Sequence, residues 1–452
     1  MASTSLEKTF GQVGNRQTWT FSAWIKRAGL GTGQNIFSSF PQSTDYQRIM
    51  FNSSDKLYNA EVGGGATAWE VETDAVYRDT SAWYHLVLRQ DTTEATADNR
   101  VRIYINNVQQ TFGTNTQPAQ NRGTQINTAD VHKIGKGDAS EYFDGEMSHI
   151  HWCDGQSYAP TAFGEYDANG VWKIKTSPSV TYGTNGFFIL KDGNSVTDQS
   201  GNGNNWTVSG GTLTNTEDNP SNVFCVLNKL QKPYPAQSNT LGLGNTKYAD
   251  NSASWQRNYG TIGATTGKWF YEFKNLQDNN NTGECRIGWD SIDFINDSSD
   301  NYYSGLTIDR AGKLRGGIKG VSGYSPNEVQ MTAAYSGGDF TFTANDILGM
   351  AIDLDNETFS VYKNGNLEIN AYSYAGVSNN SISKSRGYFI APSVNWYSST
   401  GDVNRGCFNF GNGYFEATAV SSAGTNASGN GIFEYDVPTG YTAFCTKGLN
   451  GE

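Results

Sequence analysis

The sequence predicts an all-β protein made of two tandem jelly-roll β-sandwiches, and three observations lead to this fold class. Aromatic residues make up 13% of the 452 residues, and apolar residues alternate with polar ones at the period of a strand. Gly, Asn, Ser and Thr separate these runs, as they do in turns. The Ala, Glu, Lys and Leu heptads of long helices are missing from the sequence. At about 150 residues per domain, the length suits two or three domains.

The strands of the first half begin at residues 18–26, where aromatic and aliphatic side chains take every second position. Trp24 is the exception, because it falls on the polar side of this run. Similar alternating runs follow at residues 83–88 and 101–105. The second of these runs ends at Asn106 and Asn107, a strong short-range signal for a hairpin turn. Strands separated by turn-rich segments indicate a sandwich or a barrel.

A junction divides the chain at residues 193–220, which consist almost entirely of Gly, Asn, Ser, Thr and Asp. We therefore expect one domain at residues 1–215 and a second at residues 216–452. In the second half the strand pattern resumes at residues 268–274, 287–289, 346–353 and 359–362. The last run leads into Asn364-Gly365, another hairpin signal. The second half is thus predicted to be another β-sandwich.

The charge and the cysteines exclude several classes of protein. The 32 Lys and Arg residues against 44 Asp and Glu residues give a net charge of -12, which opposes binding to nucleic acid. No segment approaches the ~20 apolar residues of a spanning helix, and residues 1–5 open no signal peptide. We therefore expect a protein made in the cytoplasm, with no membrane insertion. The five cysteines, an odd number without a metal or redox spacing, are expected to be small buried residues: Cys153, Cys225, Cys285, Cys407 and Cys445.

Four phrases of the first half resemble the laminin-G-like branch of the concanavalin A-like lectin/glucanase superfamily. They are WTFSAWIK at residues 19–26, WYHLVL at 83–88, VRIYIN at 101–106 and FDGEM at 143–147. The phrase DQSGNGNN at residues 198–205 also looks like this family, in which it often opens the domain. Here it follows the core strands. The resemblance implies that this region supplies an edge strand from the C-terminal side, so that the sandwich runs to about residue 215.

The second half is similar to SPRY domains, which are also concanavalin A-like sandwiches. Six phrases occur in the family's order: TGKWFYEF at 266–273, RIGW at 286–289, DILGMAID at 346–353, FSVYKNG at 359–365, FIAPSV at 389–394 and FNFG at 408–411. SPRY domains commonly bind partners through loops at one edge. The resemblance covers about 180 residues of the chain.

The tandem arrangement is similar to that of virion surface proteins of marine tailed phages, such as tail fibres, receptor-binding proteins and capsid decorations. The resemblance also includes the phrases GNRQTWT at 14–20, IHWCDGQ at 150–156, GVWK at 170–173 and GNGNNWT at 201–207. It implies a protein of the virion surface that contacts other virion proteins and a host-surface glycan or receptor. A homo-oligomer is left open. Such a protein is not an enzyme, and the alternative function is a polysaccharide-degrading glycoside hydrolase.

Three carboxylates at residues 353–357 could serve that alternative. Asp353, Asp355 and Glu357 would share one face of an extended strand, and glycosidases use paired carboxylates as nucleophile and acid. The same residues also suit a tight hairpin turn. No catalytic residue is therefore assigned from the sequence.

Two other groups of residues have the donors of metal sites. Asp192, Asn194 and Asp198 form an oxygen-rich loop of the kind that binds calcium, the only cofactor that the sequence suggests, although Asx turns use the same residues. His149, His151 and Cys153 alternate along one strand at a spacing that can bind zinc. A sandwich core also buries such side chains.

Aromatic residues in loops are the candidates for ligand binding, because flat rings stack on sugars while amides and hydroxyls bind the sugar hydroxyls. Most of the 11 Trp residues belong to strand phrases and are expected in the core. The aromatic residues expected in loops are Trp255, Tyr302, Tyr303, Trp396 and Tyr397.

Overall fold

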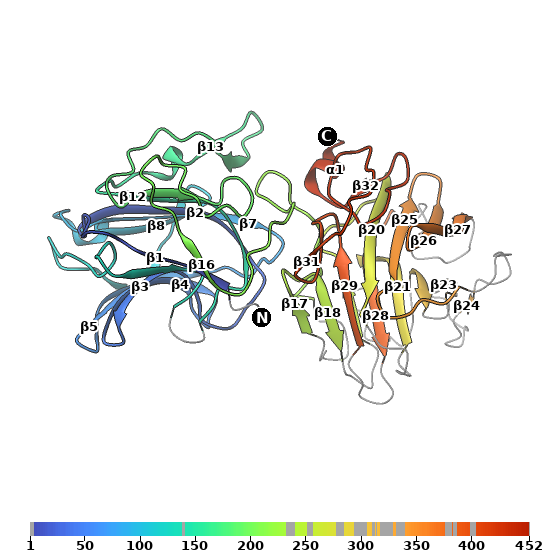
Figure 1. Cartoon of the computed structure of the whole chain (residues 1–452), viewed down its shortest axis with the longest axis horizontal. Helices are drawn as coiled ribbons and strands as arrows, with labels where there is room; N and C mark the ends of the chain where they lie inside the picture. The colour runs from blue at the N-terminus through green and yellow to red at the C-terminus, as the bar shows by residue number, and fades with distance from the viewer. Residues whose placement is uncertain are drawn as a thin grey trace. The chain divides into compact units, whose positions relative to one another are not determined.

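The computed structural model divides into two compact units (Figure 1), Met1–Asn215 with Asn219–Ser221 and Thr216–Asp218 with Asn222–Glu452. The structure describes residues 4–137, 141–231, 240–250, 256–276, 284–292, 305–309, 312, 314–316, 329–330, 340–375, 382, 387–397 and 404–451. Each unit contains two large, mostly antiparallel sheets. The all-β prediction, with two tandem sandwiches, is confirmed.

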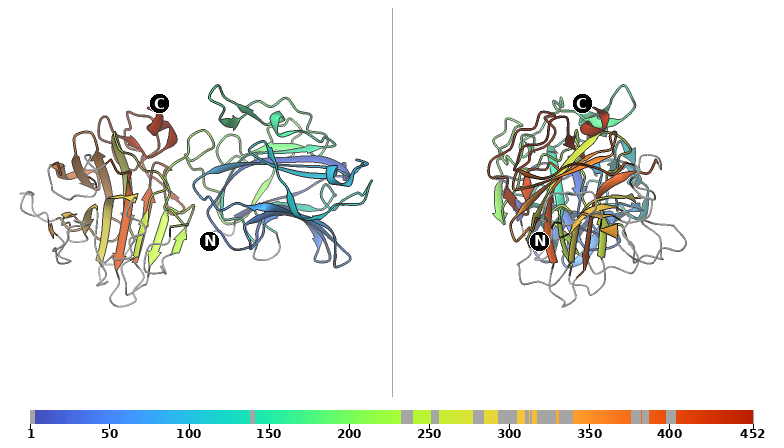
Figure 2. Two further views of the ribbon diagram at one scale, coloured as in Figure 1. Left: turned by 180° about the vertical axis from the view of Figure 1, so that it is seen from behind. Right: turned by 90° about the vertical axis from the view of Figure 1, so that its right-hand side faces the viewer.

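The first unit consists of two layers of strands, which Figure 2 also shows from behind. Sheet 1 has eight strands in the order β10-β6-β5-β4-β3-β11-β1-β16, and sheet 2 has six in the order β15-β12-β2-β7-β8-β9. The strands of sheet 1 are β1 (Thr4–Thr9), β3 (Gln34–Gln42), β4 (Asp45–Phe51), β5 (Lys56–Gly63), β6 (Ala66–Val76), β10 (Phe112–Thr116), β11 (Val131–Ile134) and β16 (Thr207–Gly210). Those of sheet 2 are β2 (Thr18–Arg27), β7 (Trp83–Asp91), β8 (Val101–Ile105), β9 (Val108–Gln109), β12 (Gly145–Asp154) and β15 (Phe187–Ile189).

The predicted edge strand and hairpin are both present. Strand β16 pairs antiparallel with β1, with Val208 opposite Leu6, and it forms the edge of sheet 1. The resemblance therefore predicted the strand order correctly. Asn106 and Asn107 connect β8 to β9 with positive φ angles of 49° and 69°, as the tightest hairpin turns require.

The core of the first unit lies between the two sheets. Because side chains alternate along each strand, Trp19, Phe21, Ala23 and Ile25 of β2 all point into this core. Trp24 lies on the outer face of sheet 2 and is nevertheless only 4% exposed. Residues 155–185 cover that face. Phe163 of this segment forms a second small core there with Val87 and Cys153 of the sheet. The covering segment contains the two-stranded hairpin of β13 (Gly164–Tyr166) and β14 (Trp172–Ile174).

The second unit has the same two-layer organisation. Sheet 3 has the order β17-β18-β29-β20-β25-β26-β27, with β32 paired to β20, and sheet 4 has the order β19-β28-β21-β22-β23-β24. Sheet 3 contains β17 (Thr240–Gly242), β18 (Lys247–Asp250), β20 (Lys268–Asn275), β25 (Ile347–Asp353), β26 (Thr358–Lys363), β27 (Asn366–Ser373), β29 (Asn404–Asn409) and β32 (Thr442–Ala443). Sheet 4 contains β19 (Gln256–Tyr259), β21 (Glu284–Ser291), β22 (Leu306–Asp309), β23 (Leu314–Gly316), β24 (Val329–Gln330) and β28 (Ile390–Tyr397).

A C-terminal segment crosses the outer face of sheet 3. Its Phe433 and Val437 pack on Phe270 of β20. Between these contacts, the buried carboxylate of Glu272 accepts hydrogen bonds from the backbone N–H groups of Glu434 and Tyr435, both at 2.9 Å. The segment is thus joined to the sheet by apolar packing around one acidic side chain. All five cysteines of the chain are buried and form no disulfide, as expected.

Candidate functional site

The outer face of sheet 1 carries a cluster of aromatic and charged side chains. They point outward because the residues between them in the strand point into the core. In β4, Gln47, Ile49 and Phe51 are buried, so Tyr46 and Arg48 point outward. Arg48 is paired in register with Ser38 of β3 and Ala60 of β5, and these two small side chains leave room around its guanidinium. We use the name aromatic–arginine face for the outward cluster of Tyr46, Arg48, Tyr58, Glu70 and Glu141.

The Arg48 guanidinium is the centre of this face. Its Cζ atom lies 5.4 Å from the ring centre of Tyr46 and 5.7 Å from that of Tyr58, within the range of cation–π attraction. Its Nη1 atom lies 3.2 Å from Oε2 of Glu141. Both charged side chains are partly exposed, at 23% and 29%. The face therefore offers flat apolar rings beside charged hydrogen-bonding groups.

Hydrogen bonds hold the acidic residues of the face in place. The Tyr58 hydroxyl donates to Oε2 of Glu70 at 2.7 Å, and the Asn35 side-chain amide donates to Oε2 of Glu141 at 2.8 Å. Burial, followed by the bond to Glu70, raises the pKa of Tyr58 far above its ordinary value. Tyr58 therefore remains a protonated donor at neutral pH.

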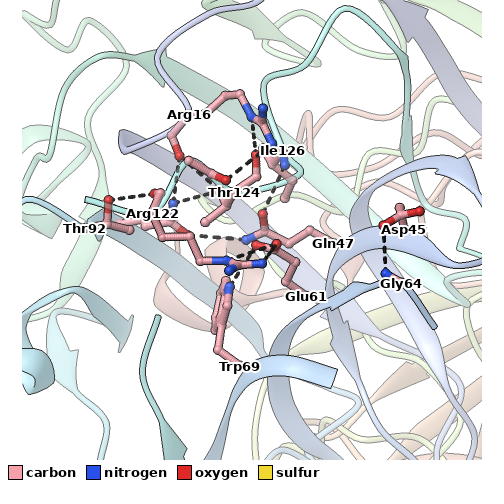
Figure 3. Close-up of polar contacts among 12 residues, drawn as sticks. Arg16, Asp45, Gln47, Glu61, Gly64, Trp69, Thr92, Arg122, Thr124 and Ile126 are labelled. Atoms are coloured by element: carbon pink, nitrogen blue, oxygen red, sulfur yellow. Dashed lines mark hydrogen bonds and ion pairs between the residues drawn. The ribbon is translucent and has the colours of Figure 1, made fainter. Parts of the chain in front are cut away.

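A buried polar network supports the strands beneath this face (Figure 3). Glu61 of β5 is fully buried and accepts from Trp69 Nε1 at 2.9 Å and from Arg122 Nη2 at 2.6 Å. The side-chain oxygen of Gln47 accepts from the backbone N–H of Ile126 at 3.1 Å. The loop that carries Arg122 and Ile126 is thereby fixed to the same strands that carry Arg48 and Tyr58.

The start of β4 is fixed separately. The Gly64 backbone N–H donates to Oδ1 of Asp45 at 2.9 Å (Figure 3). This bond, together with donors on Gln42 and Thr44, lowers the pKa of Asp45. Because Asp45 precedes Tyr46, the bond ties that ring to the turn between β5 and β6.

None of the five predicted contact residues receives support as a surface site. Trp255, Tyr302 and Tyr303 lie outside the described residues. The loop prediction was wrong for Trp396, which belongs to β28 and is fully buried against Tyr248 and Phe273. The strand extends further than its sequence pattern indicated. Tyr397 is its last residue.

The predicted calcium loop is built as an Asx turn. The Asp198 carboxylate accepts four hydrogen bonds from Phe188, Ser200 and Asn204, at 2.8 to 2.9 Å. Asp192 and Asn194 are exposed, and the Asn194 side-chain amide donates to the Leu213 carbonyl at 3.0 Å. Donor hydrogens point at all the available positions of Asp198, so these three residues do not fit a calcium ion.

Of the three carboxylates of residues 353–357, Asp353 ends β25, whereas Asp355 and Glu357 lie in the turn that follows it. Asp353 accepts from the backbone N–H groups of Asp355 and Asn356 at 3.0 Å and pairs with Lys268 at 3.1 Å. Burial alone would raise the pKa of Asp353, but the bonds from Asn356 and the Lys268 charge outweigh it, and the pKa is lowered. Glu357 has a positive φ of 53° within the turn. The strand face that would align these groups is not formed, whereas the turn interpretation is confirmed.

The predicted zinc spacing is also broken. Strand β12 is irregular between Ser148 and His151, and His149 has a φ of 47°. His151 Nδ1 lies 3.0 Å from the Tyr182 hydroxyl, and Cys153 is buried. Within the described part of the chain, no group of three His, Cys, Asp or Glu side chains is arranged to hold a metal ion.

The aromatic–arginine face was not predicted from the sequence. Its members come from β4, β5, β6 and a loop, and the first four become neighbours only through the register of β5 with β4 and β6. The outward positions of the segment YQRIMF at residues 46–51 were nevertheless readable as an aromatic and a basic residue on one strand face. This signal could have directed attention to sheet 1.

Comparison with known proteins agrees with the fold. Residues 3–156 match the family described as the concanavalin A-like lectin/glucanases superfamily, so the first unit contains a concanavalin A-like domain. No curated protein matches the chain. The structure of the SPRY domain of human HERC1 is similar to part of this chain, with 18% identity and a TM-score of 0.26. The match covers 38% of this chain and 92% of that one.

Two further solved structures are similar to parts of the chain. Domain 4 of AbnA, an extracellular arabinanase from Geobacillus stearothermophilus, in complex with arabinotriose, has 20% identity and a TM-score of 0.25, and the match covers 32% of this chain and 64% of that one. The heptameric SAP-like pentraxin from Limulus polyphemus has 17% identity and a TM-score of 0.26, over 35% and 72% of the two chains. Among the residues that the structure describes, no helix has the length and apolar character to cross a membrane.

Proposed function

We propose that the protein binds a host-surface glycan through the aromatic–arginine face, as a non-enzymatic component of a virion surface. The observation that carries the binding function is the partly exposed Arg48 guanidinium, held beside the rings of Tyr46 and Tyr58 and against Glu141. Rings take the C–H face of a sugar, while guanidinium and carboxylate groups bind its hydroxyls. The description of the matched family as lectins and glucanases supports a sugar as the ligand.

The virion location is supported by the resemblance of the tandem arrangement to phage surface proteins. Charged residues are only 17% of the chain, and few charges suit broad contacts with other proteins. Other virion proteins are therefore the proposed partners besides the glycan, and residues outside the aromatic–arginine face would make those contacts.

The alternative function, glycoside hydrolysis, receives less support. It requires a protonated acid beside a second carboxylate, whereas Asp353 is ion-paired with Lys268 and Glu357 lies in the same turn. We expect no reducing sugar to be released from any polysaccharide that the protein binds. Release that disappears in Asp353→Asn would overturn the non-enzymatic proposal.

Affinity electrophoresis through gels that contain host cell-surface polysaccharide tests glycan binding. We expect the wild-type protein to be retarded and Arg48→Met to lose at least tenfold in affinity. Lys133→Met is the matched control. The substitution removes a cation from the same outer face, but Lys133 pairs with Glu7, at 3.8 Å, which is not part of the aromatic–arginine face. Equal retardation of Arg48→Met and wild type, or none for wild type, would contradict the proposed site.

Mass spectrometry of purified particles tests the virion location independently. The chain should be present in particles after washing, and a particle reconstruction should place sheet 1 toward the outside. Its absence from particles would remove the virion part of the proposal and leave glycan binding to be judged by electrophoresis.

A further inference from the structure

A column of four rings runs outward from sheet 2. Trp24 of β2 stacks on His85 of β7, with ring centres 4.8 Å apart and planes at 14°. His85 stacks on Trp172 of β14 at 5.8 Å and 26°. Trp172 meets Tyr166 of β13 edge to face at 4.9 Å and 67°. We use the name ring column for these four residues, which join the buried Trp24 to the surface.

Hydrogen bonds fix the orientation of the column. Trp172 Nε1 donates to His85 Nδ1 at 3.0 Å. His85 Nε2 therefore carries the imidazole hydrogen and donates to the Ser22 hydroxyl at 2.9 Å. Burial lowers the pKa of His85 to about 3, so that Nδ1 remains an acceptor at neutral pH. The indole of Trp172 consequently has one position.

The outer end of the column is open to solvent. Tyr166 is 54% exposed, and within the described residues Phe389 is the other aromatic side chain among the strongly exposed apolar ones. The Tyr166 hydroxyl lies 3.4 Å from Asn107 Nδ2. Asp167, which follows Tyr166 in the chain, pairs with Lys173 at 2.9 Å. The Tyr166 ring is thus held by Trp172 on one side and exposed on the other. The amide of Asn107, the carboxylate of Asp167 and the ammonium group of Lys173 lie around it.

We propose that Tyr166 is the stacking platform of a second carbohydrate site, which takes one sugar ring of a neutral glycan. The exposed ring would contact the C–H face of the sugar, while Asn107, Asp167 and Lys173 would bind hydroxyls. A protein partner would need an area of about 800 Å² on this side. In the β8–β9 and β13–β14 hairpins, the strongly exposed apolar side chains are only Tyr166, Val108 and Val171, which is too few for such an interface. One sugar ring matches the size of one aromatic ring.

This inference rests on the proposed glycan-binding function and extends it. The aromatic–arginine face is on the outer side of sheet 1, whereas the ring column stands on the outer side of sheet 2, the opposite layer of the same sandwich. A trisaccharide cannot reach both sites. Two glycan segments would bind one first unit, and joined segments on a cell surface would gain avidity without any new contact.

The site can be tested on the intact chain labelled with ¹⁵N at the tryptophan indoles. The probes are neutral trisaccharides built from glucose, galactose or arabinose. The indole signal of Trp172, assigned by its loss in Trp172→Phe, should shift with at least one probe. Tyr166→Ala should weaken that response about tenfold, whereas Tyr166→Phe, which retains the ring, should change it less than about threefold. Phe389→Ala is the control for loss of an exposed ring in the other unit.

The outcomes separate this site from the proposed function. A Trp172 response that is lost in Tyr166→Ala and retained in Arg48→Met supports the ring-column site, even if the aromatic–arginine face binds nothing. No Trp172 shift with any probe, or an equal shift in Tyr166→Ala, overturns it. In that case, retardation of the protein by host polysaccharide that Arg48→Met abolishes would leave the proposed function intact.

Discussion

Arg27 and Asp55 form a buried ion pair at one end of the first sandwich, with Nη2 3.0 Å from Oδ1 and side-chain exposures of 0% and 5%. Arg27 also lies 4.1 Å from the ring centre of Phe51. Toward the other end of β2, the buried carboxylate of Glu61 pairs with Arg122 at 2.6 Å. Buried charged pairs therefore lie beside the apolar core toward both ends of the strand.

Removing one partner of the Arg27 pair should be costly. Asp55→Ala leaves the buried Arg27 guanidinium without its carboxylate partner, although the Tyr77 carbonyl still accepts one hydrogen bond from it, and we expect a loss of about 3–5 kcal/mol in the unfolding free energy of the first unit. Chemical denaturation followed by tryptophan fluorescence would measure it. Glu7→Gln, which breaks the exposed pair with Lys133, should cost less than about 1 kcal/mol. Equal effects of the two changes would argue against the role assigned to Arg27.

The first unit should lose stability in acid because its histidines are buried. Burial lowers the pKa of His85 to about 3 and those of His132 and His149 to about 4, and it also lowers the pKa of His151 well below its ordinary value. The unfolded chain takes up these protons near pH 6.5, whereas the folded chain does not. Stability is therefore complete above pH 6.5 and falls as the pH drops toward 4. Calorimetric scans between pH 7 and 4 would measure this decline, and an unchanged first transition would contradict it.

The second unit should respond to pH in the opposite direction because of Glu272. Burial raises the pKa of Glu272 from 4.5 to about 7, despite bonds from Glu434, Tyr435 and Asn409 that favour the charged form. The nearby Glu434 charge also contributes to the increase. The folded state therefore holds a proton that the unfolded state releases, so stability is complete below pH 4.5 and declines up to pH 7. A difference of ~2.5 between these pKa values corresponds to about 3 kcal/mol.

Replacing Glu272 tests this assignment. Glu272→Gln should remove the decline of the second calorimetric transition between pH 4.5 and 7, because the side chain can no longer ionise. The acid sensitivity of the first unit should remain as in the wild-type protein. If the pH dependence of both units is the same in the variant as in the wild type, Glu272 is not the group that titrates.

Calcium chelation should leave the first unit unchanged, whereas Asp198→Asn should not. The Asp198 oxygens accept four hydrogen bonds. An asparagine would place an NH₂ group against N–H donors of this loop, and we expect a cost of about 1–3 kcal/mol. Thermal unfolding with and without EDTA measures both effects. A lower melting temperature in EDTA that calcium restores would show that the loop binds the ion.

Local patterns in the sequence predicted the strands and the Asn106-Asn107 turn, because these features depend on alternation and on turn chemistry over a few residues, whereas the edge strand β16 was expected only from the family resemblance. Trp24 was recognised as an exception, but its burial depends on His85 of β7, which stacks on it and on Trp172 of the segment at residues 155–185, and no local pattern contains these contacts. The neighbours of Arg48 depend on strand register. Trp396 was misplaced because β28 continues into a stretch that its composition marks as a loop.

The pairing of β1 with β11 and β16 has a consequence for how the chain folds during synthesis. Leu6 lies opposite Ile134 on one side and Val208 on the other, so β1 is made long before either of the strands with which it pairs. At about 5–20 residues per second, the delay before residue 208 is made lasts roughly 10–40 seconds. Through that interval the edge of β1 that faces β16 stays unpaired, and its other edge is unpaired until residue 134 is made, so a newly made chain would depend on chaperones or on early collapse around β2 and β7 to avoid premature association.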